Sequence, residues 1–262
     1  MTPPREHEPP PGSIAPHPTL TTYYADDRAR ASFVTTLFDT AAAQYDRVCW
    51  LGSLGSGRVH RRQTLRRAGL RRGMRLLDVA TGTGLVAESA VDILGAPSAV
   101  VGLDASPGML GQARRRLEGR LVQGRAEALP FPPDAFDMLS IGYALRHVTD
   151  LAVTFREWLR VLRPGGRVVI LEISRPRSAL GRGLIRLYMQ RVLPLVMRLG
   201  RDGAKADLLL RYYWDTIAEC VPPETILHVL RQSGFAEVQR RVFGGMFSEY
   251  VAEKPPATAR AD

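Results

Sequence analysis

A strand, a glycine turn and the start of a helix follow one another within residues 75–87, and this stretch constrains the fold most. The apolar run 76–79 leads into a turn that contains Gly82 and Gly84, and a helical pattern opens at Leu85. Glycines let a ligand approach the backbone closely, and the free N–H groups that open a helix suit an anionic group. The stretch therefore predicts an open α/β sheet that holds a nucleotide-like ligand at its strand ends.

A carboxylate follows the turn at the spacing that ribose binding requires. Asp104 ends the apolar run 100–103, roughly twenty residues after the turn, where it can accept hydrogen bonds from ribose hydroxyls. The spacing Gly82-x-Gly84-x-x-Ala87 also fits the dinucleotide fingerprint. The turn alone thus leaves open whether the ligand is a dinucleotide or another adenosine derivative.

Strand patterns alternate with helical patterns along most of the chain. Strands are expected at 75–80, 98–104, 119–123, 136–142 and 167–173, and helices at 23–43, 58–68, 85–94, 107–117 and 150–162. A helix near 223–233 precedes two strands, 237–243 and 246–253, whose Gly244-Gly245 link predicts an antiparallel hairpin. Strands that alternate with helices predict a parallel sheet. We therefore expect an α/β, Rossmann-like fold with a seven-stranded, mostly parallel sheet, a C-terminal antiparallel hairpin and a helical lid insertion.

One domain is expected over 23–254, between two tails. Residues 1–22 are rich in proline and lack the apolar segment of a secretory signal, so they predict a disordered tail, and 255–262 predict a second one. No apolar run approaches the roughly 20 residues of a membrane span. Cys49 and Cys220 fit neither a disulfide framework nor a metal cluster. We expect a cytoplasmic protein that binds no metal.

An insertion at about 175–220 is not needed to complete the sheet. Its leucines and valines fall at helical spacing, arginines accompany them, and no acidic residue occurs before Asp202. Pro194 is expected to break or kink the helix. One interpretation is a lid helix with a solvated basic face. The other is a basic amphipathic element, over 175–201, that contacts a membrane surface peripherally.

The net charge of +10 comes almost entirely from arginine, since Lys205 and Lys254 are the only lysines. Such an imbalance is typical of a GC-rich genome. Because genome composition accounts for the arginines, we expect no nucleic-acid partner. A basic surface also attracts anionic lipid. A homodimer is left open.

Five motifs occur in order along the chain: Phe38-Asp39-x5-Tyr45-Asp46, Asp78-Val79-Ala80-Thr81-Gly82-Thr83-Gly84, Ala126-Glu127-Ala128-Leu129-Pro130-Phe131, Leu145-Arg146-His147-Val148-Thr149-Asp150 and Leu171-Glu172-Ile173-Ser174-Arg175-Pro176. Together, over about 33–253, they resemble the ubiquinone/menaquinone biosynthesis C-methyltransferases. This family belongs to the class I S-adenosylmethionine (SAM)-dependent methyltransferases. The resemblance implies that SAM donates a methyl group to a ring carbon of a polyprenylated, quinol-like aromatic substrate at the membrane surface.

The resemblance also implies a cofactor site. It places Thr83 and its flanking glycines at the methionyl end of SAM, Asp104 on the ribose, and Arg125 with Ala126 beside the adenine. Tyr45 would close over the cofactor. The expected cofactor-binding residues are Tyr45, Asp78, Ala80, Gly82, Thr83, Gly84, Asp104, Ala105, Met109, Arg125, Ala126 and Gly142.

Three residues are the catalytic candidates. For a ring carbon to attack, a neighbouring phenol must lose its proton, so the site needs a base and a cation near the phenolate. Arg146 is too basic to accept a proton and is assigned to stabilising the phenolate or orienting a water. His147 titrates in the right range and is the candidate base, the alternative being a structural histidine. Tyr45 is expected to act as a lid over the sulfonium.

Several positions depart from the family pattern. Arg125 stands where the family has Asp or Asn, Gly142 where a small polar residue is commoner, and His147 where Asn is usual. These departures lie mainly on the substrate side, so the particular quinone stays open. The alternative function is a small-molecule O-, N- or C-methyltransferase of secondary metabolism.

Three other classes of protein fit these motifs less well. A nucleic-acid amino-methyltransferase would need Asp/Asn-Pro-Pro-Tyr/Phe after the fourth strand, which residues 141–145 lack. A non-catalytic SAM-binding scaffold fits poorly with the intact glycine turn and Asp104. An NAD-binding oxidoreductase remains the last alternative.

Overall fold

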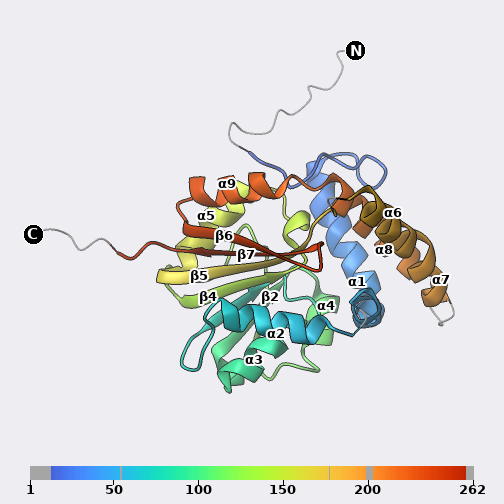
Figure 1. Cartoon of the computed structure of the whole chain (residues 1–262). Helices are drawn as coiled ribbons and strands as arrows, with labels where there is room; N and C mark the ends of the chain where they lie inside the picture. The colour runs from blue at the N-terminus through green and yellow to red at the C-terminus, as the bar shows by residue number, and fades with distance from the viewer. Residues whose placement is uncertain (1–12, 54, 177, 199–202, 258–262) are drawn as a thin grey trace, which may run out of the picture.

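The computed structural model describes residues 13–53, 55–176, 178–198 and 203–257, and a seven-stranded sheet forms its centre (Figure 1). The strands are β1 (Leu76–Val79), β2 (Val100–Asp104), β3 (Arg120–Gln123), β4 (Phe136–Gly142), β5 (Leu162–Ile173), β6 (Ala236–Phe243) and β7 (Phe247–Glu253). Their order in the sheet is β3-β2-β1-β4-β5-β7-β6. The first five strands pair in parallel, and β7 pairs antiparallel with both β5 and β6. The expected fold class is confirmed.

The strand order reverses between β1 and β4, and this reversal places the site. From β1 the chain builds outward to β2 and β3, then returns to add β4 on the other side of β1. Val79, at the end of β1, pairs with Leu103 of β2 and Ile141 of β4, so the three strands end together. In open α/β sheets, ligands bind in the crevice at such a switch point.

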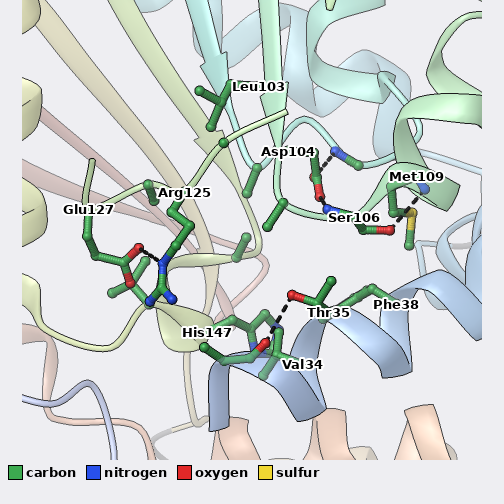
Figure 2. Close-up of a pocket in the computed structure, with 18 of the residues that line it drawn as sticks. Val34, Thr35, Phe38, Leu103, Asp104, Ser106, Met109, Arg125, Glu127 and His147 are labelled. Carbon is green, nitrogen blue, oxygen red and sulfur yellow. Dashed lines mark hydrogen bonds and ion pairs between the residues drawn. The ribbon is translucent and has the colours of Figure 1, made fainter. Parts of the chain in front are cut away.

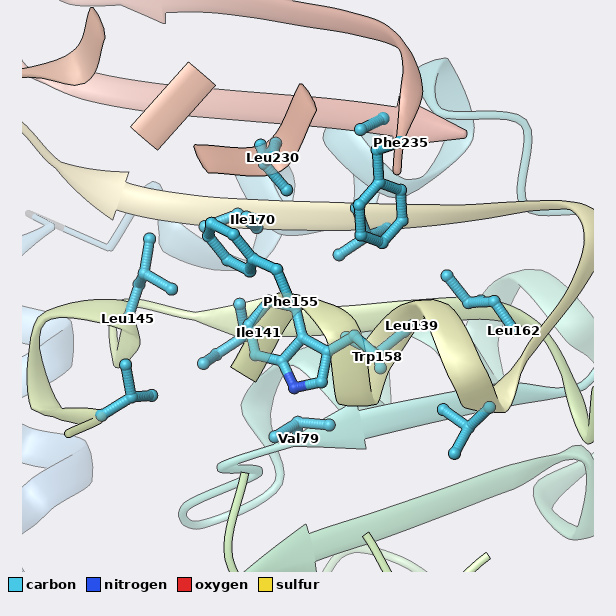
Figure 3. Packing of buried hydrophobic residues seen from close by; sticks show 14 of the residues in the cluster. Val79, Leu139, Ile141, Leu145, Phe155, Trp158, Leu162, Ile170, Leu230 and Phe235 are labelled. Atoms are coloured by element: carbon cyan, nitrogen blue, oxygen red, sulfur yellow. The ribbon is translucent and has the colours of Figure 1, made fainter. Parts of the chain in front are cut away.

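Helices cover both faces of the sheet and build one core on each. On one face lie α5 (Leu151–Val161) and α9 (Pro223–Gln232), and on the other α2 (Gly57–Arg67) and α3 (Leu85–Leu94) (Figure 1). Figure 3 shows Trp158 and Phe155 of α5 packed with strand residues such as Ile141. The Trp158 indole N–H donates to the Ala126 carbonyl at 3.1 Å, so this core also anchors the loop after β3.

A third group of helices covers the ends of the parallel strands. It contains α1 (Asp27–Gly52), α4 (Pro107–Ala113), α6 (Ala179–Leu187), α7 (Leu193–Arg198) and α8 (Gly203–Glu219) (Figure 1). Short helical turns are η1 (Pro97–Ala99), η2 (Leu145–His147) and η3 (Tyr188–Val192). Leu193 is buried with apolar residues of α1 and α8, so the insertion is a packed helical layer. No helix in the described ranges is both long and apolar enough to cross a bilayer.

Pro194 changes the helix type without ending the helix. The preceding segment, η3, is a π-helical turn, and the Leu193 N–H donates to the Tyr188 carbonyl five residues earlier. Proline lacks the N–H that an α-helix would use at this position, and a π-turn is one way to accommodate the loss. The expected break is therefore a local widening of the helix.

Residues 13–17 run along the domain, which corrects the expected tail. The Ser13 hydroxyl donates to the Asp150 carboxylate at 2.5 Å, and the Ile14 carbonyl accepts from the Leu151 N–H at 2.8 Å. The Pro16 carbonyl accepts from Val221, and His17 is buried. The prediction of a disordered tail over 1–22 is thus wrong for these residues. Residues 1–12 and 258–262, also predicted as tails, lie outside the described ranges.

Candidate active site

A cavity of about 420 Å³ opens at the carboxyl ends of β1, β2 and β4, next to α1 (Figure 2). Ten of the residues predicted for the site line it: Tyr45, Ala80, Gly82, Asp104, Ala105, Met109, Arg125, Ala126, Gly142 and His147. The other four, Asp78, Thr83, Gly84 and Arg146, lie outside its lining. The loops after four different strands therefore meet as the strand order requires.

Asp78 supports the glycine turn through side-chain hydrogen bonds. Its side chain is buried, with one carboxylate oxygen accepting from the Thr81 hydroxyl at 2.7 Å and the other from the Ser140 hydroxyl at 2.6 Å. Burial raises the pKa of this carboxyl to about 6, against the opposing effect of these hydrogen bonds. Asp78 lies outside the cavity lining, where its two oxygens join the glycine turn to β4, and its contact with the ligand stays a prediction.

This raised pKa predicts a pH-dependent stability. Because the native pKa of Asp78 lies above its ordinary value of 3.8, the stabilising contribution is complete below 3.8 and is lost as the pH rises through about 6. Asp78→Asn should remove that loss, so wild type should lose about 3 kcal/mol relative to the variant across this window. Urea unfolding of both proteins at several pH values measures the difference. A pH-independent difference would contradict the burial argument.

The two glycines of the turn serve different purposes. Gly82 and Gly84 both have left-handed backbone, with φ of 57° and 88°. A Cβ on Gly82 would lie 4.0 Å from the Tyr45 ring, so Tyr45 covers the turn where the lid was expected. A Cβ on Gly84 would instead lie 3.0 Å from Leu117, which shows that Gly84 permits helix packing.

Thr83 also points away from the cavity. Its hydroxyl donates to the carboxylate of Asp46, which in addition pairs with Arg116. This network ties α1 to the glycine turn and to the end of α4. Thr83 and Gly84 therefore make structural contacts outside the cavity lining, and their contacts with the ligand stay predictions.

Asp104 faces the cavity with its carboxylate already oriented. Its two oxygens accept from the backbone N–H groups of Gly82, at 2.8 Å, and Ser106, at 2.9 Å. Each oxygen keeps a further lone pair for a ligand hydroxyl. Burial raises the pKa of Asp104, with these backbone donors opposing the shift. The expected ribose contact fits this geometry.

Asp39, which was missed by the sequence argument, supports the site from outside the cavity lining. From α1, its carboxylate accepts from the Ser106 hydroxyl and from the Gly108 N–H, the latter at 2.8 Å. It thereby fixes α1 against the N-terminus of α4. The only sequence signal was its place in the Phe38-Asp39 motif.

The adenine side of the cavity contains an ion pair. Arg125 is about half exposed, and its Nε lies 3.5 Å from the carboxylate of Glu127. The same carboxylate accepts from the Thr149 N–H at 2.8 Å, so it links two of the loops that line the cavity. Glu127 was also missed as a site residue by the sequence argument. The family has Asp or Asn at the position of Arg125, and the Glu127 carboxylate lies beside that position.

Gly142 leaves space that another residue fills. A Cβ on Gly142 would lie 2.6 Å from Cγ2 of Val86, a distance that no real contact permits. Val86 therefore occupies the place that a side chain at position 142 would need. The departure from the family pattern at Gly142 has this steric cause.

Arg146 is held behind the cavity wall, which corrects its predicted placement in the site. It is 1% exposed, and its guanidinium forms an ion pair with Glu172 of β5. It also donates to the Tyr143 carbonyl at 2.7 Å and to the Thr216 hydroxyl at 3.1 Å. These bonds leave the guanidinium outside the cavity lining, and a contact between Arg146 and the substrate stays a prediction.

His147 does line the cavity, but it does not titrate near neutral pH as predicted. Its ring stacks on Tyr212 at 5.4 Å and meets Phe38 edge-on at 5.2 Å. Burial, and then the positive charge of Arg146, hold the pKa of His147 well below its ordinary value. Neither ring nitrogen has a hydrogen-bond partner among the described residues. The site thus offers a neutral, unpartnered imidazole.

The cavity fits an adenosine ligand. The glycine turn gives backbone access, and the Asp104 carboxylate suits a ribose. Apolar groups of Leu103, Met109 and Ala126 can flank a flat base. The described residues contain no group of three or more His, Cys, Asp or Glu side chains that could hold a metal ion.

Comparisons with known proteins agree with this geometry. A family model described as the ubiE/COQ5 methyltransferase family matches residues 25–254. The chain is 35% identical over 212 residues to the ubiquinone/menaquinone biosynthesis C-methyltransferase UbiE of Hahella chejuensis, covering 78% of this chain and 84% of that one. It is 37% identical over 221 residues to the demethylmenaquinone methyltransferase of Clavibacter sepedonicus, covering 83% and 88%.

Solved structures share the fold at lower identity. A SAM-dependent methyltransferase from Thermotoga maritima gives a TM-score of 0.59 at 20% identity, covering 84% of this chain and 99% of that one. The [4+2]-cyclase SpnF gives a TM-score of 0.64 at 17% identity, covering 86% and 96%. Since one of these proteins is a cyclase, the fold by itself does not assign the reaction.

Proposed function

This chain belongs to the ubiE/COQ5 methyltransferase family, and we propose that it transfers the methyl group of SAM to a ring carbon of a polyprenyl hydroquinone or similar phenol. SAM-dependent methyl transfer is the reaction class of the family. The observation that carries the proposed acceptor is the make-up of the cavity. A carboxylate, Asp104, lies at the end beside the glycine turn, and an aromatic wall with a neutral imidazole lies at the end beside η2.

Residues of the glycine turn and of β2 would hold the methyl donor. SAM supplies an electrophilic methyl group on a positively charged sulfur. Asp104 binds the ribose hydroxyls, and the Gly82 backbone allows the methionyl end to approach. Leu103 and Met109 flank the base. Tyr45 covers the turn and excludes water, which keeps the reacting groups aligned.

The opposite end of the cavity would orient the acceptor. Phe38 offers an aromatic surface beside the His147 ring, and Tyr213 lies 6.0 Å from both of these rings. A neutral imidazole has one N–H donor and one acceptor nitrogen, so it can hydrogen-bond the oxygen of a phenol or of its phenolate and so fix the ring carbon toward the methyl group. His147 serves here as an orienting hydrogen-bond partner, because its lowered pKa makes it a weak base. The ring carbon gains the methyl group as the methyl–sulfur bond breaks and leaves S-adenosylhomocysteine, and the ring carbon then loses its proton to solvent, which restores aromaticity.

We also propose that the insertion contacts the membrane in which a polyprenyl acceptor resides. Leu180, Leu184 and Leu187 of α6 and Leu195 of α7 are between 55% and 75% exposed. On α6 these leucines recur every three or four residues, which places them on one side of the helix. Arg182 and Arg186 belong to the same helix. Positions 177 and 199–201 of this predicted membrane element lie outside the described residues. The homodimer stays a prediction.

A quinone profile tests the proposed function. Mass spectrometry of lipid extracts should show respiratory quinone lacking one methyl group in a deletion strain, and normal quinone after complementation. In vitro, the purified protein should methylate a reduced demethylquinone with SAM. An unchanged profile and no turnover would favour the small-molecule methyltransferase of secondary metabolism. The departure at His147 supports that second candidate.

A further inference from the structure

One cation beside the site has no counter-ion among the described residues. Arg30 of α1 is 0% exposed. Its Nη2 donates to the Arg146 carbonyl at 2.9 Å and lies 2.8 Å from Nε2 of His17. Its Nε and Nη1 have no hydrogen-bond partner within the described ranges. Arg30 is therefore a buried guanidinium whose hydrogen bonds all go to neutral groups.

Arg146, the neighbouring buried guanidinium, differs from Arg30 because it has a counter-ion, Glu172. Two buried guanidinium groups, Arg30 and Arg146, are thus joined at η2, and Glu172 pairs with only one of them. Leaving a buried charge unpaired is costly, and side chains in that situation normally have a partner. An anionic ligand group at the η2 end of the cavity would supply one.

The position of Arg30 connects it to the cavity wall. The next residue, Ala31, lines the cavity, and the carbonyl that Arg30 binds belongs to the residue directly before His147. Arg30 consequently fixes the backbone that presents the His147 ring and places its charge behind that ring. The carboxylate of Asp104 lies in the lining beside the glycine turn, so the cavity has an anionic end and a cationic end.

We propose that Arg30 is a positioning residue whose uncompensated charge, acting behind His147, stabilises the acceptor as its phenolate. This inference rests on the proposed function, since it takes a phenolic acceptor for granted. The hydroxyl gives its proton to solvent buffer as the phenolate binds, and the negative charge is then shared with the ring carbon that attacks. Arg30 contacts neither substrate nor cofactor.

The groups that interact with Arg30 keep one protonation state near neutral pH. They are His17 from the segment before α1, Tyr212 from α8, Cys220 before α9, and Arg146 and His147 from η2. Burial lowers the pKa of His17 to about 4 and raises the pKa of Cys220 to about 12. The pKa of His147 is lowered and that of Tyr212 raised, both by burial. Asp78, whose pKa is about 6, is the same in wild type and in the Arg30 variants, so a difference between their pH profiles reports the acceptor.

The matched variants are Arg30→Gln, which removes the charge and keeps a donor for the Arg146 carbonyl, and Arg30→Lys, which keeps the charge. For Arg30→Gln, kcat/KM for the reduced demethylquinone should fall about tenfold near pH 7, as expected if the pKa of the bound acceptor hydroxyl rises by about one unit. It should recover as the pH rises, while Arg30→Lys stays close to wild type. Binding of S-adenosylhomocysteine should be unchanged in both.

The outcomes separate the two proposals. If wild type does not methylate the quinol, the proposed function fails. If wild type is active and Arg30→Gln keeps its rate and pH profile, the inference fails. An Arg30→Gln rate that is low at every pH indicates a merely structural role and also overturns it.

A second measurement needs only the wild type. Bound 4-nitrophenol, displaced by the quinol as a check on its site, can be titrated by its visible phenolate absorbance. Its pKa should be lower when bound than when free. An equal or higher bound pKa contradicts the inference even if the variants do not fold.

Discussion

Replacing Glu172 with leucine is expected to lower the free energy of unfolding by about 3–5 kcal/mol, because it leaves Arg146 as an unpaired buried cation. Glu172 is 2% exposed, and besides the ion pair with Arg146 it accepts from the Ile173 N–H at 2.8 Å. Leucine can satisfy neither donor. Chemical denaturation with a fluorescence readout measures the loss.

Two control variants test whether the unpaired charge of Arg146 causes this loss of stability. The double variant Arg146→Met/Glu172→Leu removes both charges and should recover a large part of the loss, since apolar residues can replace a buried pair at little cost. Arg163→Ala breaks the exposed pair between Arg163 and Asp137 and should cost less than about 1 kcal/mol. Equal losses for the single and double variants would contradict the unpaired-charge explanation.

Replacing Asp104 with alanine is expected to weaken SAM binding by about 100-fold or more. The carboxylate orients the Gly82 and Ser106 N–H groups and faces the cavity, so its loss removes both the ligand contact and the shape of the turn. Hydrogen bonds to charged groups contribute about 1.5–3 kcal/mol each, and two of them account for this change. Isothermal titration calorimetry with SAM measures it directly.

Asp92→Ala is the matched control for Asp104. Asp92 lies on α3 and pairs with the exposed Arg58 at 2.9 Å, away from the cavity lining. Its removal should leave the SAM affinity unchanged. If Asp104→Ala folds and binds SAM within about threefold of wild type, a difference below 1 kcal/mol, then the assignment of Asp104 to the ribose is wrong.

Elements with strong local signals were predictable to the residue. The predicted bounds of α3 and β4, 85–94 and 136–142, are the observed ones. Helix α3 ends because Gly95 takes left-handed backbone, with φ of 69°, as a C-terminal glycine commonly does. Such signals lie within a few residues of the boundary, so no long-range contact is needed to find it.

Elements shaped by distant contacts were predicted less well. Helix α1 continues to Gly52, beyond the predicted end at 43, because Val48 and Leu51 pack against the insertion that arrives from residues 188–213. Helix α4 ends at Ala113, before the predicted 117, where Arg116 turns to pair with Asp46 of α1. In both cases the boundary depends on a partner far away in the sequence.

The sequence by itself determined the strand, glycine turn and helix of residues 75–87, the carboxylate of Asp104 and the family to which the chain belongs. These depend on local spacing, which a linear pattern carries in full. Only the tertiary structure decided the chemical state of the site. It buries Arg146 against Glu172, holds His147 neutral, and leaves Arg30 without a counter-ion among the described residues. Charge and pKa depend on burial and on neighbours from distant segments, so they follow from the assembled fold.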